Sequence, residues 1–245
     1  MCDVNKEVKI NRLGTLYGIG IGPGDPELVT LKALKILKMV DIIFAPKAST
    51  KSSSIAREIV ERLVDAASIE ELVFPMTRDK DELHRFWGLS AHRVYSALSS
   101  GRDAAFITLG DPLIYSTYSY LLRYLRREDE DLHIVTIPGI SAINAAASAM
   151  EIPIAEGDER FVIMPLPKEM EELKDALRNF DTVIILKIGK DLERLKNFLM
   201  DEGLGESSYF INRIGTDEEY YAKGMSLLKQ DASGYLSTMI IRTGT

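Results

Sequence analysis

Two copies of the tripeptide Gly-Asp-Pro, at Gly24–Pro26 and Gly110–Pro112, are the residues of this chain best placed to bind a ligand. Each copy separates a strand-like apolar run from a helix-like run. In both, the aspartate suits the N-cap of a helix, the proline its first position and the glycine a tight turn. Such turns lie at the carboxyl ends of strands, the edge where open α/β sheets bind ligands. The repeat therefore predicts a ligand site with two walls.

Glycines stand at alternate positions from Gly18 to Gly24, the first residue of the first copy, and such a run can indicate a phosphate-binding loop. The spacing does not give G-x-G-x-x-G, because a proline and an aspartate stand where the last glycine would fall, and no G-K-[ST] follows. The second predicted strand is followed by Pro46 and Lys47, without the acidic residue that a dinucleotide ribose requires. The run therefore disfavours a nucleotide-phosphate site, and its first two glycines could serve close packing alone.

Cations and hydroxyl groups follow the second and third predicted strands. These side chains, which can clamp carboxylates through charge-assisted hydrogen bonds, are Lys47, Ser49, Lys51, Thr77 and Arg78. Because parallel strands end at one edge of their sheet, we expect these residues at the same edge as the Gly-Asp-Pro turns. The three histidines are scattered and the chain has one cysteine, so no protein-bound metal is predicted.

Strands and amphipathic helices alternate along the whole chain. In the first half the predicted strands are 15–22, 41–45, 69–74, 104–109 and 133–137, and the predicted helices are 27–38, 54–64, 80–98 and 113–126. In the second half the predicted strands are 160–164, 182–186, 208–212 and 236–242, and the predicted helices are 140–150, 169–177 and 191–200. This alternation predicts α/β domains at 12–138 and 139–245, with a hinge at about 139–155 and a mostly parallel sheet in the first.

The composition is that of a globular protein with a net negative charge, so any anionic ligand must be bound by locally placed cationic groups. Of its 245 residues, 46% are hydrophobic and 27% are charged, which suffices for one large or two modest domains. The net charge of -7 argues against a nucleic-acid-binding protein, whose surface is normally basic. The single cysteine, Cys2, cannot form an internal disulfide, and neither a signal peptide nor a membrane span is visible. We therefore expect a cytoplasmic protein with no membrane partner.

These turns resemble the signatures of the tetrapyrrole (precorrin-type, class III) methyltransferases, which use S-adenosyl-L-methionine. The segments that carry the resemblance are Leu16–Thr30, Leu109–Thr117 and Ile137–Ser141. Within the family, the chain most resembles the C20-methyltransferases of precorrin-2 or cobalt-factor II. The segments that carry this finer resemblance are Phe74–Asp79, Tyr115–Tyr120 and Ala155–Arg160.

The resemblance implies two α/β domains with an active-site trough between them, a homodimer, S-adenosyl-L-methionine as methyl donor and S-adenosyl-L-homocysteine as product. Carried over by position, the cofactor contacts are expected at Pro23, Gly110, Asp111, Ile114, Ser116, Thr117, Ser141, Ala142, Leu186, Asn212 and Thr238. Lys187 departs from this pattern, because a cation beside a sulfonium is unfavourable. We therefore expect its ammonium to face the substrate or solvent.

The implied activity is C-methylation of a tetrapyrrole at C20. It would convert precorrin-2 or cobalt-factor II to the trimethylated precorrin-3A or cobalt-factor III in cobalamin (vitamin B12) biosynthesis. Transfer from a sulfonium to a carbon nucleophile requires alignment more than acid or base chemistry. The five cationic and hydroxyl residues named above would bind the carboxylate arms, and any cobalt would belong to the substrate. The proton acceptor stays open between water, Asp25 and Tyr115.

Other interpretations remain beside this one. An enzyme of the same fold could instead be a uroporphyrinogen-III C-methyltransferase, another precorrin methylase or diphthine synthase. A non-catalytic nucleotide-binding regulatory module is the alternative from another class, against which the missing phosphate and ribose signals argue. Within the favoured interpretation, we expect the Asp111 turn to bind the cofactor and the Asp25 turn to shape the floor of the trough.

Overall fold

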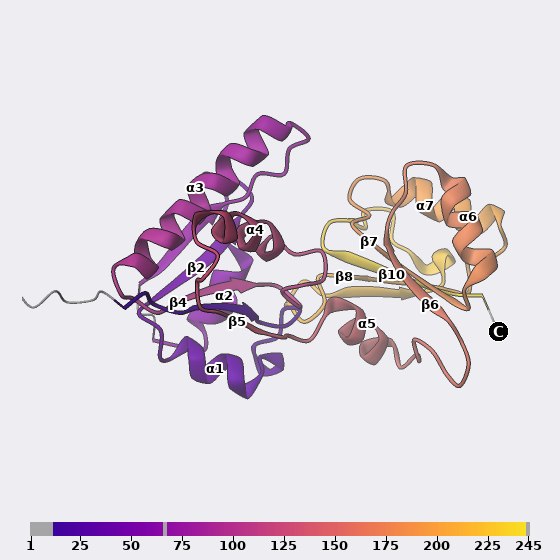
Figure 1. The fold of residues 1–245 in the computed structure, drawn as a ribbon. Coiled ribbons are helices and arrows are strands. Elements are labelled where there is room, and N and C mark those ends of the chain that lie inside the picture. The colour runs from indigo at the N-terminus through magenta and orange to yellow at the C-terminus, as the bar shows by residue number, and fades with distance from the viewer. Residues whose placement is uncertain (1–11, 66–67, 244–245) are drawn as a thin grey trace, which may run out of the picture. The chain divides into compact units, whose positions relative to one another are not determined.

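The structure, a computed structural model, describes residues 12–65 and 68–243 (Figure 1), so Cys2 lies outside the described residues. The chain divides into two compact units. Unit 1 comprises the chain up to Gly22 together with Pro26–Gly139, and unit 2 comprises Pro23–Asp25 and the chain from Ile140 onward. The first Gly-Asp-Pro copy is therefore split between the two units at Pro26.

Unit 1 is built on a parallel sheet, as the alternation predicted. Its strands are β1 (Leu16–Gly20), β2 (Ile42–Lys47), β3 (Ile69–Val73), β4 (Ala104–Thr108) and β5 (Ile134–Ile137). Their order across the sheet is β3-β2-β4-β1-β5, and all the neighbouring pairs are parallel. All five strands therefore end at one edge, which places the loops after β1, β4 and β5 next to one another.

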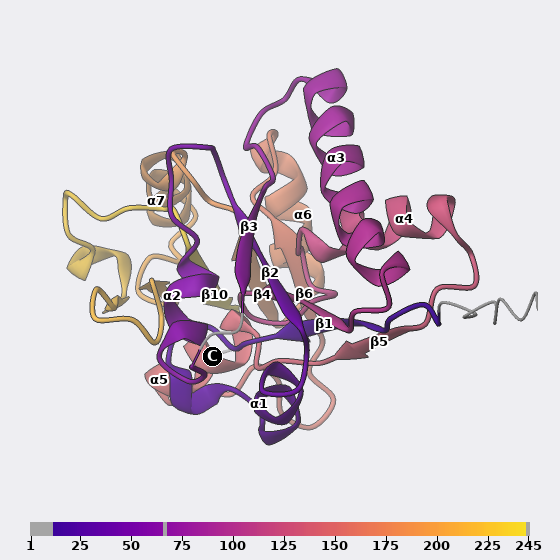
Figure 2. The same cartoon turned by 90° about the vertical axis from the view of Figure 1, so that its left-hand side faces the viewer.

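Helices cover both faces of this sheet, as Figures 1 and 2 show. They are α1 (Leu31–Leu37), α2 (Ile55–Glu61), α3 (Lys80–Ser99) and α4 (Tyr118–Glu128). Alternate residues of β4 enter two cores: Phe106 packs with α3 and α4, and Ile107 packs with α1 and α2. This alternation follows from the period of two along a strand.

Gly18 has a packing role in unit 1. A Cβ atom at this position would overlap the ring of Tyr118, which is fully buried and bonded to the hydroxyl of Thr136 at 2.9 Å. The ring of Tyr118 also stacks near Phe106, with 6.1 Å between ring centroids. Gly18 is therefore required to seat the first turn of α4 against the sheet.

Unit 2 contains a mixed sheet. Its strands are β6 (Phe161–Pro165), β7 (Thr182–Leu186), β8 (Ser208–Asn212), β9 (Tyr220–Lys223) and β10 (Ser237–Arg242), in the order β6-β7-β10-β8-β9. Strands β6 and β7 are parallel, whereas β10 runs antiparallel to both β7 and β8. The carboxyl ends of β7 and β8 therefore lie beside the start of β10. Strand β9 was absent from the predicted elements.

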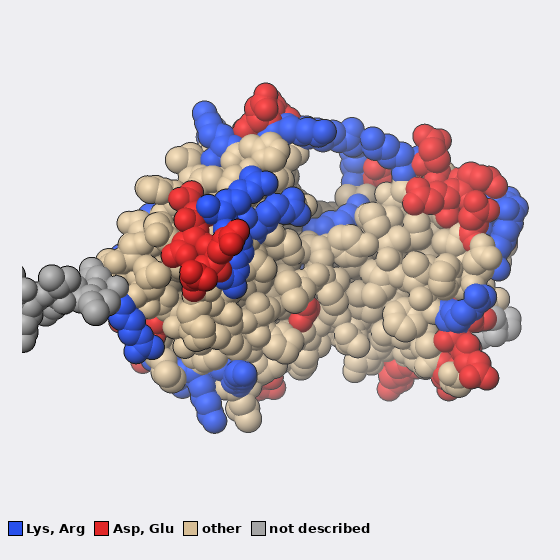
Figure 3. Space-filling view, viewed as in Figure 1, with Lys and Arg blue, Asp and Glu red and all other residues tan. Residues whose placement is uncertain are grey.

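The helices of unit 2 are α5 (Ala142–Met150), α6 (Met170–Asn179) and α7 (Leu192–Asp201). Helix α5 packs on one face of the sheet through the cluster that holds Ile184, Ile211 and Ile240, while α6 and α7 pack on the other. Charged side chains gather over α6 and α7 in Figure 3. Lys174 of α6 forms an ion pair with Glu202, which follows α7. Within the described residues, no helix has both the length and the apolar composition needed to span a membrane.

The predicted helix starts after the two Gly-Asp-Pro turns were wrong. A short 3-10 turn at Pro26–Leu28 follows Asp25, and α1 begins only at Leu31, where Thr30 Oγ1 accepts the N–H of Ala33 at 3.1 Å. After Asp111, α4 begins at Tyr118. Neither aspartate is the N-cap of an α-helix, because a 3-10 turn follows Asp25 and a loop follows Asp111. The fold class itself, α/β with a parallel sheet in the first unit, is confirmed.

Candidate functional site

The ends of β1, β4 and β5 meet through three glycines. A Cβ atom on Gly20 would lie 2.6 Å from the carbonyl oxygen of Gly110 and 2.7 Å from the nitrogen of Gly139. The N–H of Gly110 also donates to the carbonyl of Gly22 at 2.7 Å. Because a side chain at Gly20 would displace backbone, these loops are fixed against one another at the edge where ligands bind parallel sheets.

Asp111 lies at this crossing and is bonded to the backbone of its own unit. Its Oδ1 accepts the N–H of Leu113 at 2.9 Å, and its Oδ2 accepts the N–H of Gly139 at 3.2 Å. A carboxylate oxygen has a second lone pair, so both atoms keep acceptor capacity. Asp111 thus links the loop after β4 to the end of β5, and a ligand could still be bound through the same carboxylate.

The rest of the loop after β4 combines exposed apolar side chains with one strained residue. Leu113, Ile114 and Tyr115 are 59%, 40% and 45% exposed. Tyr115 has a φ of 49°, in the left-handed region that costs a residue with a side chain about 1–2 kcal/mol. Ser116 bonds to the hydroxyl of Thr108 at 2.9 Å and accepts the N–H of Tyr118 at 3.1 Å. Its hydroxyl is therefore committed to the loop itself.

The two ends of the C20-like segment Tyr115–Tyr120 have different surroundings. Thr117 precedes α4 and makes no side-chain cap to the helix. Tyr120 stacks on Trp87 of α3, with ring centroids 4.2 Å apart and planes inclined by 4°. The segment thus joins the exposed loop after β4 to the packing of α3 against α4.

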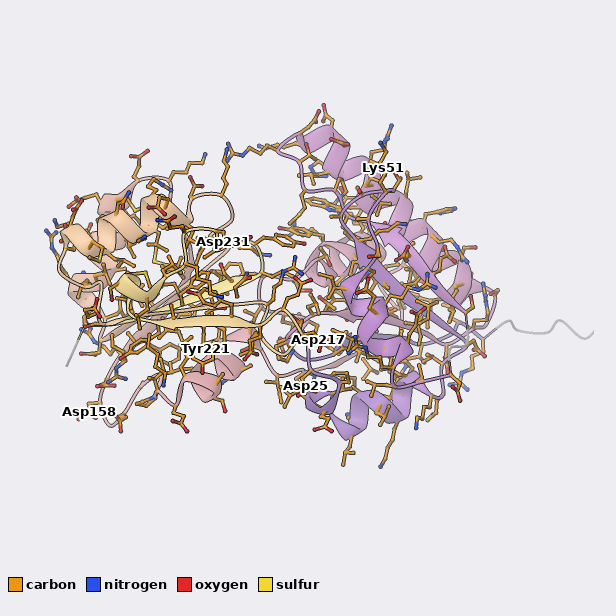
Figure 4. All side chains as sticks on the ribbon, turned by 180° about the vertical axis from the view of Figure 1, so that it is seen from behind. Asp25, Lys51, Asp158, Asp217, Tyr221 and Asp231 are labelled. Atoms are coloured by element: carbon orange, nitrogen blue, oxygen red, sulfur yellow. The ribbon has the colours of Figure 1, made fainter. Side chains whose placement is uncertain are left out.

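Pro23, Gly24 and Asp25 belong to unit 2, where they pack against the loop after β8. A Cβ atom on Gly24 would lie 2.5 Å from the carbonyl oxygen of Ile214. Gly215 has a φ of 77°, and a Cβ atom there would lie 2.6 Å from the nitrogen of Asp25. Figure 4 labels Asp25 and, on the adjoining loop, Asp217. The first Gly-Asp-Pro copy is therefore held by close packing against the loop after β8. The second copy is instead held where the loops after β1, β4 and β5 meet.

The second group of expected cofactor residues lies at one edge of the sheet of unit 2. Leu186 ends β7, Asn212 ends β8, and Thr238 lies at the start of β10. Met239 pairs with Ile185, so Thr238 and Leu186 stand one residue beyond this pair on adjacent strands. The structure brings these three residues together. Asn212 is 7% exposed and donates its side-chain N–H to the carbonyl of Tyr235 at 2.5 Å.

Ser141 and Ala142 begin α5. Ser141 Oγ accepts the N–H of Asn144 at 3.3 Å as the N-cap of the helix. Ala142 packs against the same apolar cluster that Leu186 contacts. The start of α5 and the end of β7 therefore share one core, which connects the third signature segment to the sheet edge described above.

The backbone at this edge of unit 2 is irregular. Between the pair Ile185–Met239 and the isolated bridge Gly189–Gly234, residues 186–188 lie opposite residues 235–238, so the β10 side carries one residue more. The regular pairing of β7 with β10 is therefore interrupted over this stretch. Three residues here have left-handed backbones: Lys187 (φ 56°), Arg213 (φ 50°) and Leu236 (φ 53°). Sequence patterns gave no signal for this strain, because none of the three is a glycine.

Lys47 is already paired within unit 1. Its ammonium lies 2.9 Å from a carboxylate oxygen of Glu71, and both side chains are 16% exposed. Glu71 also accepts the N–H of Ser54, the N-cap of α2, at 2.9 Å. The hydrogen bond from Lys47 holds the pKa of Glu71 below its ordinary value. Lys47 therefore positions the loop after β2, and its charge is largely balanced.

The other expected substrate residues have more freedom. Lys51, labelled in Figure 4, and Arg78 are exposed, and within the described residues neither has a carboxylate at ion-pair distance. Ser49 bonds to Ser52 in a serine turn, and Thr77 Oγ1 accepts the N–H of Asp79 at 3.1 Å. Strands β2 and β3 are paired neighbours, so both loops start from one place on the sheet.

Within the described residues, no group of three or more histidine, cysteine or acidic side chains is arranged to hold a metal ion.

Comparisons with known proteins give a consistent result. The model of the family described as Tetrapyrrole (Corrin/Porphyrin) Methylases matches residues 15–225. A probable cobalt-precorrin-2 C(20)-methyltransferase of Methanocaldococcus jannaschii is 43% identical over 197 residues, which span 79% of this chain and 80% of the relative. A precorrin-2 C(20)-methyltransferase of Sinorhizobium sp is 30% identical over 239 residues, which span 94% and 95% of the two chains.

A solved structure shares the fold. It is the uroporphyrin-III C-methyl transferase from Thermus thermophilus complexed with S-adenyl homocysteine, which is 20% identical with a TM-score of 0.63. The match covers 94% of this chain and 97% of that one.

Proposed function

This chain belongs to the tetrapyrrole (corrin/porphyrin) methylase family, and we propose that it methylates C20 of precorrin-2 or cobalt-factor II in cobalamin biosynthesis. The observation that carries this proposal is the 43% identity to the M. jannaschii relative over four fifths of that protein. The related names differ in whether the substrate contains cobalt, so the proposal includes both substrates.

We propose S-adenosyl-L-methionine as the methyl donor. The fold is shared with a structure solved with the demethylated cofactor, which supports the choice. In unit 1, Gly110, Asp111, Ile114 and Thr117 would bind it, because the loop offers exposed apolar surface beside a carboxylate with spare acceptor capacity. Ser116 would act by shaping this loop, since its hydroxyl is bonded to Thr108.

In unit 2, the cofactor residues would be Pro23, Ser141, Ala142, Leu186, Asn212 and Thr238. Asn212 donates its amide N–H to the carbonyl of Tyr235, which leaves its amide oxygen as an acceptor. Leu186 is only partly buried, so it can offer apolar surface to a flat ring. A mixture of apolar walls and a few polar groups is typical of small-molecule sites.

When bound, the cofactor supplies an electrophilic methyl group on a sulfonium. The chain's own residues must hold the acceptor carbon in line with that methyl, about 3–3.5 Å away, and exclude water. The close backbone packing at Gly20, Gly110 and Gly139 suits this task because it leaves the loops little freedom. The methylated carbon then loses a proton to water, to Tyr115 or to Asp25, which remain the candidates.

Lys51 and Arg78 are the proposed partners of the substrate's carboxylate arms, with Ser49 and Thr77 as neighbouring polar groups. Charge-assisted hydrogen bonds of this kind are the strong ones in proteins. Lys47 fits better as a residue that orders the loop after β2, because Glu71 balances its charge. We also propose that the protein is cytoplasmic and forms a homodimer. The family resemblance supports the homodimer, and light scattering of the purified protein tests it.

Mass spectrometry of the products tests the proposed reaction. The purified chain would be incubated with labelled S-adenosyl-L-methionine and with precorrin-2, factor II, cobalt-factor II or uroporphyrinogen-III. We expect one added methyl on precorrin-2, factor II or cobalt-factor II, at C20 by NMR. Methylation of uroporphyrinogen-III alone would contradict the proposal, as would tight binding of NAD or ATP without binding of S-adenosyl-L-homocysteine in calorimetry.

A further inference from the structure

The end of β7 presents a cation on strained backbone. Lys187 follows Leu186 directly and has a φ of 56°, within the irregular stretch where residues 186–188 lie opposite residues 235–238. A left-handed backbone costs a residue with a side chain about 1–2 kcal/mol, which a glycine would avoid. Strain of this kind persists where the surrounding structure fixes it, and it gathers at functional sites.

The surroundings of Lys187 distinguish it from the other cations at strand ends. Lys47 has Glu71 at 2.9 Å, Arg213 has Glu218 at 2.7 Å and Arg242 has Glu159 at 2.9 Å. Within residues 12–65 and 68–243, no carboxylate lies at ion-pair distance from the ammonium of Lys187. Although the residue as a whole stays exposed, partial burial of the ammonium lowers the pKa of Lys187. A partly desolvated charge without a counter-ion is unfavourable until an anion joins it.

The chemistry of the proposed ligands identifies the anion. S-adenosyl-L-methionine carries a sulfonium and an ammonium beside one carboxylate, so a lysine near it meets net repulsion. A tetrapyrrole of the proposed class carries several acetate and propionate arms and is strongly anionic. On a chain with a net charge of -7, an unpaired cation beside the expected cofactor residues is therefore suited to one of those arms.

We propose that Lys187 is a substrate-recognition residue whose ammonium pairs with one carboxylate arm of the tetrapyrrole. The inference rests on the proposed function, because it takes the tetrapyrrole as substrate. It adds a cation on unit 2 to those expected on unit 1. Two backbone hydrogen bonds, from the N–H of Gly189 to the carbonyl of Gly234 and from the N–H of Leu166 to the carbonyl of Leu186, both at 3.0 Å, fix the backbone on either side of the residue.

The test compares Lys187→Met, which keeps the apolar stem, with Lys187→Arg, which keeps the charge. We expect Lys187→Met to weaken binding of factor II about tenfold or more in an absorbance titration and to raise KM with little change in kcat. S-adenosyl-L-homocysteine affinity in calorimetry should stay within about twofold of the wild type, well under a tenfold change of 1.4 kcal/mol. Lys187→Arg should recover most of the factor II binding.

Lys190→Met is the matched control, since this exposed lysine lies three residues along the same loop. It should leave both affinities unchanged. Wild-type protein should also bind factor II better than its methyl ester, a comparison that needs no variant to fold, and Lys187→Met should reduce that preference.

Each of the following results would overturn the inference. Unchanged factor II binding in Lys187→Met would show that Lys187 does not recognise the substrate. Weaker binding of S-adenosyl-L-homocysteine in the same variant would show that Lys187 pairs with the carboxylate of the cofactor instead. An equal loss of factor II affinity in Lys190→Met would show that the effect comes from the general charge of the surface and not from Lys187 itself. If wild-type protein binds none of precorrin-2, factor II and cobalt-factor II, the proposed function fails together with this inference, whereas binding without any effect of Lys187 leaves the function intact.

Discussion

The carboxylate of Asp111 accepts a hydrogen bond from the backbone N–H of Gly139 at 3.2 Å, which joins the turn after β4 to the end of β5. Its other oxygen accepts the N–H of Leu113. Asp111 therefore fixes two loops that the sequence separates by 28 residues. A ligand bound at this carboxylate would meet a group that is already oriented.

Asp111→Asn should weaken both the loop and cofactor binding. An amide presents one oxygen and one N–H₂, so one of the two backbone N–H groups loses its acceptor, at a cost of about 1–3 kcal/mol. We expect a lower urea midpoint and at least severalfold weaker binding of S-adenosyl-L-homocysteine. Asp158→Asn, on an exposed loop of unit 2 labelled in Figure 4, is the control and should change neither.

Asp25→Asn separates the roles of the two Gly-Asp-Pro copies. If the Asp111 copy is the cofactor site, the Asp25 variant should keep more affinity for S-adenosyl-L-homocysteine than the Asp111 variant. Loss of cofactor affinity on changing Asp25 but not Asp111 would reverse the assignment.

Gly20→Ala should disrupt unit 1 severely. The added methyl would lie 2.6 Å and 2.7 Å from backbone atoms of Gly110 and Gly139, and backbone cannot move aside as a flexible side chain does. We expect destabilisation of about 2–4 kcal/mol, in the range of overpacked or strained core positions, measured by urea unfolding. Near-native stability would show that the three loops are not as closely fixed as their geometry indicates.

Gly88→Ala is the matched control for that change. Gly88 lies inside α3, and the nearest atom to an added Cβ would be a ring carbon of Tyr124 at 3.8 Å, which is ordinary contact. Replacing glycine by alanine within a helix typically stabilises it by about 0.5–1 kcal/mol. The two substitutions should therefore shift the urea midpoint in opposite directions.

The sequence predicted regular elements well because apolar periodicity determines them. The ranges of β7 and β8 matched the predicted 182–186 and 208–212, and α3 differed from 80–98 by one residue. The helix starts at 27 and 113 were wrong because Thr30 caps α1 and because Tyr115 adopts a left-handed backbone before α4. Such local choices depend on contacts between distant segments, which a single sequence does not reveal.

For the same reason, the sequence predicted the placement of some candidate site residues but not the contacts of others. Leu186, Asn212 and Thr238 do lie at one sheet edge, a placement that their strands determine. The pairing of Lys47 with Glu71 depends on the register of β2 against β3, which places Lys47 opposite Val73. No sequence pattern shows which of several cations will meet a carboxylate within the fold.

Glu71→Gln should make the stability of unit 1 less dependent on pH in the acidic range. The pKa of Glu71 is depressed in the folded chain, chiefly by the hydrogen bond from Lys47, against an ordinary value of 4.5. The ionised carboxylate therefore contributes stability above pH 4.5, and this contribution is lost as the pH falls through the folded pKa. We expect the variant to lose about 1–2 kcal/mol at pH 7 and little below the folded pKa.

Urea unfolding at pH values from 7 down to 3 measures this difference. Glu61→Gln, which removes an exposed i,i+4 partner of Arg57, serves as the control and should shift stability little at any pH. A stability difference for Glu71→Gln that stays constant over the whole pH range would contradict the role given to its ionised form.

Arg78→Ala should weaken tetrapyrrole binding while sparing the cofactor. Arg78 is exposed on the loop after β3, and removing a charge-assisted pair with a carboxylate arm costs about 1.5–3 kcal/mol. An absorbance titration with factor II and calorimetry with S-adenosyl-L-homocysteine separate the two ligands. Equal loss of both affinities, or loss of neither, would count against assigning the edge of β2 and β3 to the substrate.

Substitutions at Tyr115 separate backbone strain from the chemistry of the phenol. Tyr115→Phe keeps the ring and the left-handed φ of 49°, so stability should stay within about 0.5 kcal/mol of the wild type. Tyr115→Gly should relieve about 1 kcal/mol of strain, seen as a higher urea midpoint. If Tyr115 accepts the proton from C20 as its phenolate, both variants lose kcat at full cofactor occupancy and their pH–rate profiles change. Equal kcat in wild type and Tyr115→Phe would instead leave water or Asp25 as the acceptor, with Tyr115 serving only to shape the loop.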